Sequence, residues 1–148
     1  MEFTKSSETT KFSIEYYEKF TQECLTLNEK LLIGCIQSSA IYDDGRRDDV
    51  VEAIENCFKC VPKTPYDIIA WRAGKMKEQN RRYVSASLLK ETAERYKTEK
   101  TSVHKIVIRQ GSKIFPLRAL GKDYGDNEAE IIIDTKQLKR RLGYYEYK

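Results

Sequence analysis

The stretch Asn127-Glu128-Ala129-Glu130-Ile131-Ile132-Ile133 joins two carboxylates to a short apolar run. Ala129 and the three isoleucines are typical of a buried strand. Because side chains alternate between the two faces of a strand, we expect Glu128 and Glu130 to project from the same face. Two like charges at the end of a buried strand repel one another and favour a cationic or hydroxyl-bearing partner. Taken alone, the pattern also fits an edge strand with a solvated acidic face.

Two short strands upstream supply suitable partners. Ile68-Ile69-Ala70-Trp71-Arg72 is an apolar run that ends in an arginine, and Tyr83-Val84-Ser85-Ala86-Ser87 carries two hydroxyls on one face. An arginine, then Ser-x-Ser, then Glu-x-Glu, each on a strand and in that order, resembles the arginine–serine–glutamate class of ADP-ribosyltransferases. That class includes arginine-modifying bacterial toxins, vertebrate ecto-enzymes and phage enzymes. The resemblance extends from about Glu15 to the C-terminus.

The resemblance implies an enzyme that transfers ADP-ribose from NAD to a protein arginine and releases nicotinamide. NAD is then the expected donor, and a protein with an exposed arginine is the expected partner. By the same resemblance Glu130 is the catalytic glutamate, which stabilises the cation that forms when the nicotinamide–ribose bond breaks. Glu128 would orient or deprotonate the acceptor, and a glutamate at this position points to arginine. Tyr124, in the polar loop before the glutamates, is the candidate for acceptor recognition by stacking.

The remaining site residues implied by the resemblance lie on the two upstream strands. Arg72, with Gly74 beyond it, would contact the phosphates or ribose of NAD, for which a permanent charge and forked donors are suited. Ser85 would hold the catalytic glutamate. Ser87 would contact NAD, or would cap a following helix expected from Leu88 to Tyr96. Ala73 separates the arginine from its glycine, and Ala86 replaces the threonine usual between the serines, so the sequence departs from the family pattern at two positions.

Composition agrees with a globular protein that binds a phosphate-bearing ligand. The 148 residues fit one domain, and 40% hydrophobic with 34% charged residues is a folded rather than a disordered composition. The net charge of +4 permits attraction to phosphates but does not favour nucleic acid as a partner. No apolar run is as long as a membrane span. We expect a cytoplasmic protein, and the compact length indicates a phage, viral or effector origin.

The four cysteines, at positions 24, 35, 57 and 60, invite a metal or redox interpretation because Cys57 and Cys60 form a Cys-x-x-Cys pair. The other two lack the matching spacing, and the single histidine, His104, lies far away in an apolar strand. Reduced, buried thiols are therefore expected, with no metal site.

The order of patterns predicts an α+β fold in which N-terminal helices pack on a mixed, mainly antiparallel β-sandwich core. Residues 1–10 are expected to be loose. An apolar stripe at positions 12, 16, 20, 24, 27 and 31 predicts two helices broken near Thr26, where Thr26-x-x-Glu29 forms a capping box. A third helix should be capped by Asp48 or Asp49 and bury a stripe of Val50, Val51, Ile54 and Phe58. Residues 103–108 and 113–117 should pair as a hairpin, and residues 144–147 should add a last strand.

Three other functions remain compatible with the sequence. On the same fold, the acceptor could be water, which would make the protein an NAD glycohydrolase, or a nucleic-acid base. A non-catalytic binding module is the alternative from a different class. The presence of Arg72, Ser85, Glu128 and Glu130 together argues against a site that has lost its activity.

Overall fold

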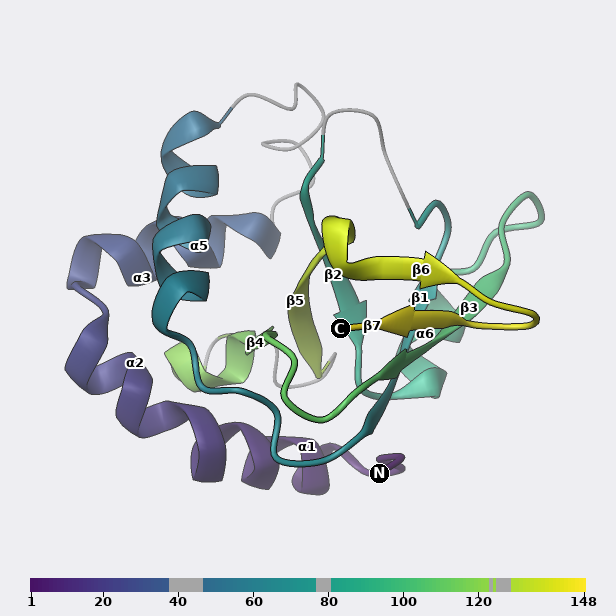
Figure 1. Ribbon diagram of the computed structural model, residues 1–148, viewed down its shortest axis with the longest axis horizontal. Helices are drawn as coiled ribbons and strands as arrows, with labels where there is room; N and C mark the ends of the chain where they lie inside the picture. The colour runs from purple at the N-terminus through teal and green to yellow at the C-terminus, as the bar shows by residue number, and fades with distance from the viewer. Residues whose placement is uncertain (38–46, 77–80, 123, 125–128) are drawn as a thin grey trace.

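The computed structural model describes residues 1–37, 47–76, 81–122, 124 and 129–148. Helices come first in the chain and strands later, as the sequence predicts (Figure 1). The helices are α1 (Ser6–Ser13), a π-helical turn (Ile14–Glu18), α2 (Lys19–Cys24), α3 (Leu27–Gly34), α5 (Asp48–Cys60) and α6 (Lys90–Arg95). The strands are β1 (Ile68–Ala73), β2 (Tyr83–Ser87), β3 (Val103–Ile108), β4 (Phe115–Pro116), β5 (Glu130–Asp134), β6 (Leu138–Arg140) and β7 (Tyr145–Tyr147). No helix in these ranges is both long enough and apolar enough to cross a membrane.

The strands form one hydrogen-bonded sheet in the order β4-β5-β2-β1-β3-β7-β6. Only the β3–β7 pair is parallel and the other recorded pairs are antiparallel, so the predicted mixed, mainly antiparallel α+β architecture is confirmed. Helices α1, α2, α3 and α5 lie beside the sheet on one side of the molecule (Figure 1). Ile131, Ile132 and Ile133 have no exposed surface, as expected for a strand that pairs with a neighbour on each side.

The predicted capping box starts α3. The Thr26 hydroxyl accepts a hydrogen bond from the Glu29 backbone N–H at 3.1 Å, and the Glu29 carboxylate accepts one from the Thr26 N–H at 3.0 Å. These two bonds satisfy donors that a helix N-terminus leaves without partners. The break between the first two helical segments is therefore confirmed at the predicted residue.

The apolar stripe predicted across that break is wrong in its second half. The π-helical turn changes the helical phase, so that Tyr17 is fully buried. Beyond it Cys24 is exposed, and Leu27 and Leu31 are 73% and 55% exposed. The extended backbone at Leu25 resets the phase again, and Ile33 becomes the buried residue of α3. A single 3.6-residue period cannot be continued through a π turn and a helix break.

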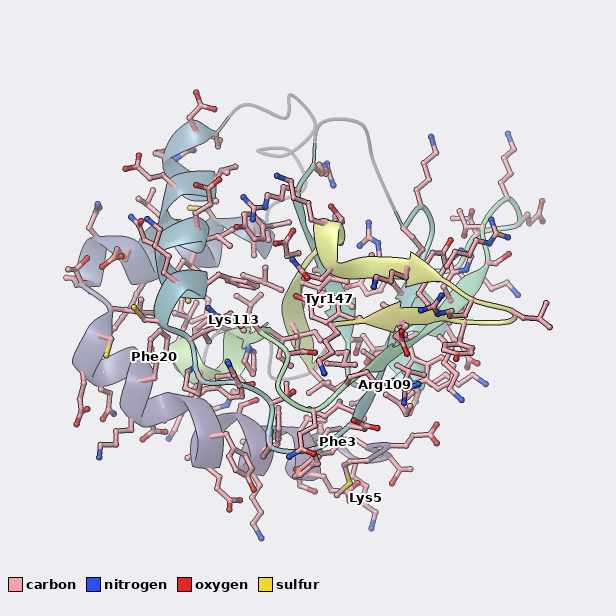
Figure 2. All side chains as sticks on the ribbon, in the orientation of Figure 1. Phe3, Lys5, Phe20, Arg109, Lys113 and Tyr147 are labelled. Carbon is pink, nitrogen blue, oxygen red and sulfur yellow. The ribbon has the colours of Figure 1, made fainter. Side chains whose placement is uncertain are left out.

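The first ten residues, which the sequence predicts to be loose, make contacts with the rest of the fold. The Phe3 ring packs on Phe12 with 5.3 Å between ring centroids, and Phe3 is 5% exposed. The Met1 ammonium donates to the Asp67 carbonyl at 2.7 Å, and the Met1 carbonyl accepts from the Ile69 N–H at 2.9 Å. The chain start thus lies against the beginning of β1, near Phe3 in Figure 2.

Helix α5 buries Val50, Ile54 and Phe58 of the predicted stripe, and Val51 is half-buried. The expected aspartate cap is wrong, because Arg47 occupies the cap position and makes no side-chain cap bond. Asp49, in the first turn, instead accepts two bonds from the Arg47 guanidinium, each of 2.8 Å. A carboxylate there still interacts favourably with the helix dipole.

The predicted hairpin between residues 103–108 and 113–117 does not form. A turn is present, since the Ser112 N–H donates to the Arg109 carbonyl at 3.2 Å, but β3 pairs with β1 and β7. Strand β4 instead pairs with β5. Local turn residues fix a reversal of the chain, whereas the partner of each strand is decided by long-range packing.

The final strand expected at residues 144–147 is confirmed as β7, and it pairs with the unpredicted strand β6. Tyr147 is fully buried near the centre of Figure 2, where its hydroxyl donates to the Lys113 carbonyl and accepts from the Asp134 N–H. Glu146, on the other face of β7, accepts from Arg109 and Arg141, each at 3.0 Å.

These ion pairs predict a loss of stability in acid. Hydrogen bonds from Arg141 and then Arg109 lower the pKa of Glu146, and hydrogen bonds from Gln110 and Arg109 lower the pKa of Asp67. A carboxyl whose pKa is lower in the folded than in the unfolded protein stabilises the fold at pH values above its unfolded pKa of about 4. This stabilisation is lost as the pH falls below that value. The urea midpoint should therefore drop below about pH 4. In acid, the urea midpoint of Glu146→Gln should fall by less than the midpoint of Glu23→Gln, a control on α2. An equal fall in both variants would contradict a role for the Glu146 ion pairs.

Candidate active site

A cavity of about 340 Å³ opens where the strands β1, β2 and β5 lie side by side. Its lining includes Arg72 from β1, Ser85 and Ser87 from β2, and Glu130 from β5. The volume lies within the range of about 300–1,000 Å³ that small-molecule sites occupy. The described residues of the predicted arginine, serine and glutamate motifs therefore meet at one cavity.

The strand register explains why the two serines and Glu130 meet. Trp71 lies opposite Ser87, and Ser87 lies opposite Glu130, so the three form a row across β1, β2 and β5. Residues directly opposite in antiparallel strands project from the same face. Ser85 lies opposite Ile132 and is a diagonal neighbour of Glu130. Ser87 is thus the direct cross-strand neighbour of the glutamate.

Arg72 connects the site to two main-chain carbonyls. Its Nη1 donates to the Ser85 carbonyl at 2.6 Å, and its Nε donates to the Lys75 carbonyl at 2.9 Å. The second bond closes a turn in which Gly74 has φ +94°, a conformation that glycine adopts without steric cost. The Gly74 N–H in turn donates to the Ser102 carbonyl at 3.1 Å. These bonds hold the guanidinium beside the serine strand.

Ser87 serves the backbone beyond its strand. Its hydroxyl accepts a hydrogen bond from the Leu89 N–H at 3.0 Å, and the residue is 6% exposed. Helix α6 begins at Lys90 with Leu89 at the cap position, so a helix starting at Leu88 with Ser87 as its cap is wrong. The serine instead stabilises the turn between β2 and α6 while lining the cavity.

Strand β5 begins at Glu130 itself, which is half-buried. Ala129 precedes it with φ +47°, a left-handed conformation that costs a non-glycine residue about 1–2 kcal/mol. The Ala129 carbonyl accepts from the Leu88 N–H at 3.0 Å, which helps to hold this turn. The expectation that Glu128 and Glu130 project from one face of the same strand stays a prediction, because only Glu130 belongs to the described strand. Glu128 lies outside the described residues.

Tyr124 packs against α3. A side-chain carbon added to Gly34 would approach the Tyr124 ring to 2.6 Å, so only glycine permits this contact. The tyrosine is half-buried against the hydrophobic core, and it is absent from the described lining of the cavity. Its predicted role in acceptor recognition stays a prediction.

The cavity has lining residues that the motif pattern did not indicate. Arg81 belongs to a basic run of the kind that usually forms a solvated face, yet it lines the cavity just ahead of β2. Trp71 is 8% exposed, and within the described part of the chain its indole N–H has no hydrogen-bond partner. Lys90 lies over the Trp71 ring at 4.9 Å from the centroid. A buried donor without a partner beside a cavity favours a ligand that carries an acceptor atom.

The cysteines and His104 lie apart from this cavity. Cys57 is buried and burial raises the pKa of its thiol, but Cys24 and Cys60 are exposed, so the expectation of four buried thiols is wrong. No group of three or more His, Cys, Asp and Glu side chains in the described ranges is arranged to hold a metal ion. The His104 ring packs edge-on against Tyr145, with 5.6 Å between ring centroids.

Sequence comparison gives no relative for this chain. No family model matches it, and no curated protein matches it.

Comparison of the fold with solved structures does give matches. An ADP-ribosyltransferase from Clostridium botulinum is 17% identical, with a TM-score of 0.62, over 99% of this chain and 96% of that one. An ADP-ribosyltransferase toxin from Paenibacillus larvae is 14% identical, with a TM-score of 0.65, over 97% and 94% of the two chains. Exoenzyme S from Pseudomonas aeruginosa, solved with human 14-3-3 protein beta and Carba-NAD, is 10% identical, with a TM-score of 0.60, over 96% and 86%.

These matches cover nearly the whole chain, so the protein has the fold of the ADP-ribosyltransferase toxins. The resemblance first indicated by the arginine, serine and glutamate motifs is therefore confirmed at the level of the fold.

Proposed function

We propose that the protein transfers ADP-ribose from NAD to a protein arginine and releases nicotinamide. The observation that carries this proposal is the convergence of Arg72, Ser85, Ser87 and Glu130 on one cavity, from three neighbouring strands of an ADP-ribosyltransferase fold. The exoenzyme S structure holds Carba-NAD, so a chain of this fold binds an NAD analogue.

The charges around the cavity fit the two halves of NAD. Arg72 and Arg81 both line it, and guanidinium groups suit the two negatively charged phosphates. Glu130 is the carboxylate in the described lining. The reaction requires cations beside the pyrophosphate of NAD and an anion beside the ribose that carries nicotinamide.

Glu130 would act when the bond between nicotinamide and ribose breaks. Nicotinamide leaves as a neutral molecule with the bonding electron pair, and the ribose carbon develops positive charge. A carboxylate fixed beside that carbon stabilises this charge more strongly than it stabilises the substrate. Ser87, directly opposite on β2, keeps the main chain of the site in place through its bond to the Leu89 N–H.

The acceptor step would use Glu128, whose role rests on the Glu-x-Glu sequence pattern. A guanidinium is protonated at neutral pH, so it must lose a proton to a base as its nitrogen attacks the ribose carbon. A carboxylate is the natural partner of its planar fork. The new bond joins that nitrogen to the ribose, and the proton passes to the carboxylate.

A two-channel assay tests the proposal. The protein is incubated with NAD labelled in its adenine and with poly-arginine, and both free nicotinamide and polymer-bound label are measured. We expect both products in equal amounts during arginine transfer, and poly-lysine should accept no label. Nicotinamide release without bound label would identify a glycohydrolase, and the absence of both would refute catalysis.

A further inference from the structure

A second groove, of about 560 Å³, lies beyond the turn that Arg72 closes. It is formed by the turn at residues 74–76, by residues 100–104 at the start of β3, and by the β6–β7 hairpin. These three segments project to the same side of the molecule in Figure 1, away from helices α1 and α2.

The sheet register builds the groove floor. Arg72 lies opposite His104 across β1 and β3, and Arg140 lies opposite Tyr145 across β6 and β7. Ile106 lies opposite Tyr145 in the parallel pair, and His104 is two residues before Ile106 on the same face. One face of the three neighbouring strands β3, β7 and β6 therefore carries His104, Tyr145 and Arg140 in sequence along the groove.

Positive charge dominates the described lining of this groove. Lys75, Lys100 and Arg140 are exposed and line it, and no aspartate or glutamate is among the described lining residues. The nearby acidic residue of the hairpin, Glu146, alternates to the opposite face and already pairs with Arg109 and with Arg141. A cluster of cations in a groove attracts an anionic ligand.

The groove also offers aromatic surface and a hydroxyl. His104 and Tyr145 are half-buried and pack edge-to-face with an interplanar angle of 88°, so one ring supports the other. Ser102 is exposed in the same lining. Cations beside aromatic rings are the combination that single-stranded nucleic acids require, because phosphates pair with the cations and bases stack on the rings.

We propose that this groove binds a single-stranded polynucleotide. Lys75, Lys100 and Arg140 contact successive phosphates, and a base stacks against the Tyr145–His104 pair. An acidic peptide would satisfy the cations alone and would leave the aromatic pair without a role. The proposal concerns binding and is independent of ADP-ribose transfer, so its test contains no NAD.

The test measures fluorescence anisotropy of a labelled oligothymidylate and of its RNA counterpart, each of about 12 nucleotides. Lys100→Ala/Arg140→Ala should weaken binding about tenfold at low salt, because two phosphate contacts are lost. The slope of log affinity against log salt should become shallower by about 1.4. Lys11→Ala/Lys19→Ala removes the same charge from exposed positions on α1 and α2 and should change neither quantity.

A second variant tests stacking. Tyr145→Leu keeps an apolar side chain on β7, and it should weaken binding by about fivefold or more while leaving the salt slope unchanged. Melting temperatures establish that each variant is folded, and if Lys100→Ala/Arg140→Ala melts early, the single change Arg140→Ala replaces it.

Four outcomes would overturn the proposal. The first is no oligonucleotide binding at about 50 mM salt. The second is equal weakening in the groove variant and in the α1–α2 control. The third is that Tyr145→Leu binds the oligonucleotide as tightly as the wild type and that poly-glutamate displaces the label as well as unlabelled oligonucleotide does. This result would identify an acidic peptide as the ligand. Equal affinity for duplex DNA would likewise exclude a single-strand site.

Discussion

Glu130→Gln is expected to reduce both arginine transfer and NAD hydrolysis by about 100-fold or more, the effect of losing one preorganised electrostatic group. The carboxylate stabilises the ribosyl cation whatever the acceptor, so both reactions need its charge. The fold should survive, because glutamine keeps the shape of the half-buried side chain at the start of β5. Initial rates of nicotinamide release, with and without poly-arginine, measure both activities.

Glu128→Gln is the matched control, since it makes the same chemical change two residues away. If Glu128 acts on the acceptor alone, this variant should lose arginine transfer and keep much of the hydrolysis, because water needs less orientation than a guanidinium. Equal loss of both activities in the two variants would show that the two glutamates do not divide the work in this way. Full arginine transfer by Glu128→Gln would exclude it as the acceptor base.

Local patterns predicted those parts of the fold that local interactions decide. The Thr26–Glu29 capping box involves residues three apart, and the isoleucines of β5 are buried wherever the strand pairs. The pairing of strands could not be predicted from local patterns, because β3 pairs with β1 and β7 rather than with the segment that follows its own turn. The order at the N-terminus likewise depends on Phe3 meeting Phe12, which the polar sequence around Phe3 does not indicate.

The candidate site shows the same division. Residue types in the right order indicated Arg72, Ser85, Ser87 and Glu130, and the fold places all four at one cavity. Register could not be read from the sequence, so the motif did not indicate that Ser87 lies directly opposite the glutamate, with Ser85 as its diagonal neighbour. Arg81 and Trp71 carry no motif signal, since each belongs to a run with an ordinary structural explanation. Their place at the cavity follows only from the positions of β1 and β2.

Arg72 combines a structural role with its proposed contact to NAD. Its Nη1 and Nε donate to the carbonyls of Ser85 and Lys75, which fixes the guanidinium between β2 and the turn after β1. Lysine has the charge but not the planar fork, so it cannot reproduce both bonds and still present the same donors. Replacement by either alanine or lysine should therefore affect ligand binding.

Arg72→Ala is expected to abolish most of the stabilisation that NAD gives to the folded protein. At a concentration of 100 times Kd, a ligand adds about 2.7 kcal/mol to the free energy of unfolding, which raises the melting temperature by several degrees. The wild-type protein should show this rise with NAD, and Arg72→Ala should show almost none at the same concentration. Arg72→Lys should recover part of it, because a cation remains for the phosphates.

The control is Lys105→Ala, which removes a charge from the exposed side of β3 directly opposite Trp71. It should keep the full rise, since Lys105 is not among the residues that line the cavity. All three variants must first melt cooperatively without ligand, so that a missing rise reflects lost binding rather than an unfolded protein. A full rise in Arg72→Ala would remove this arginine from the NAD site. A rise absent even from the wild type at millimolar NAD would refute the proposed function itself, because a transferase must bind its donor before it can break the bond to nicotinamide.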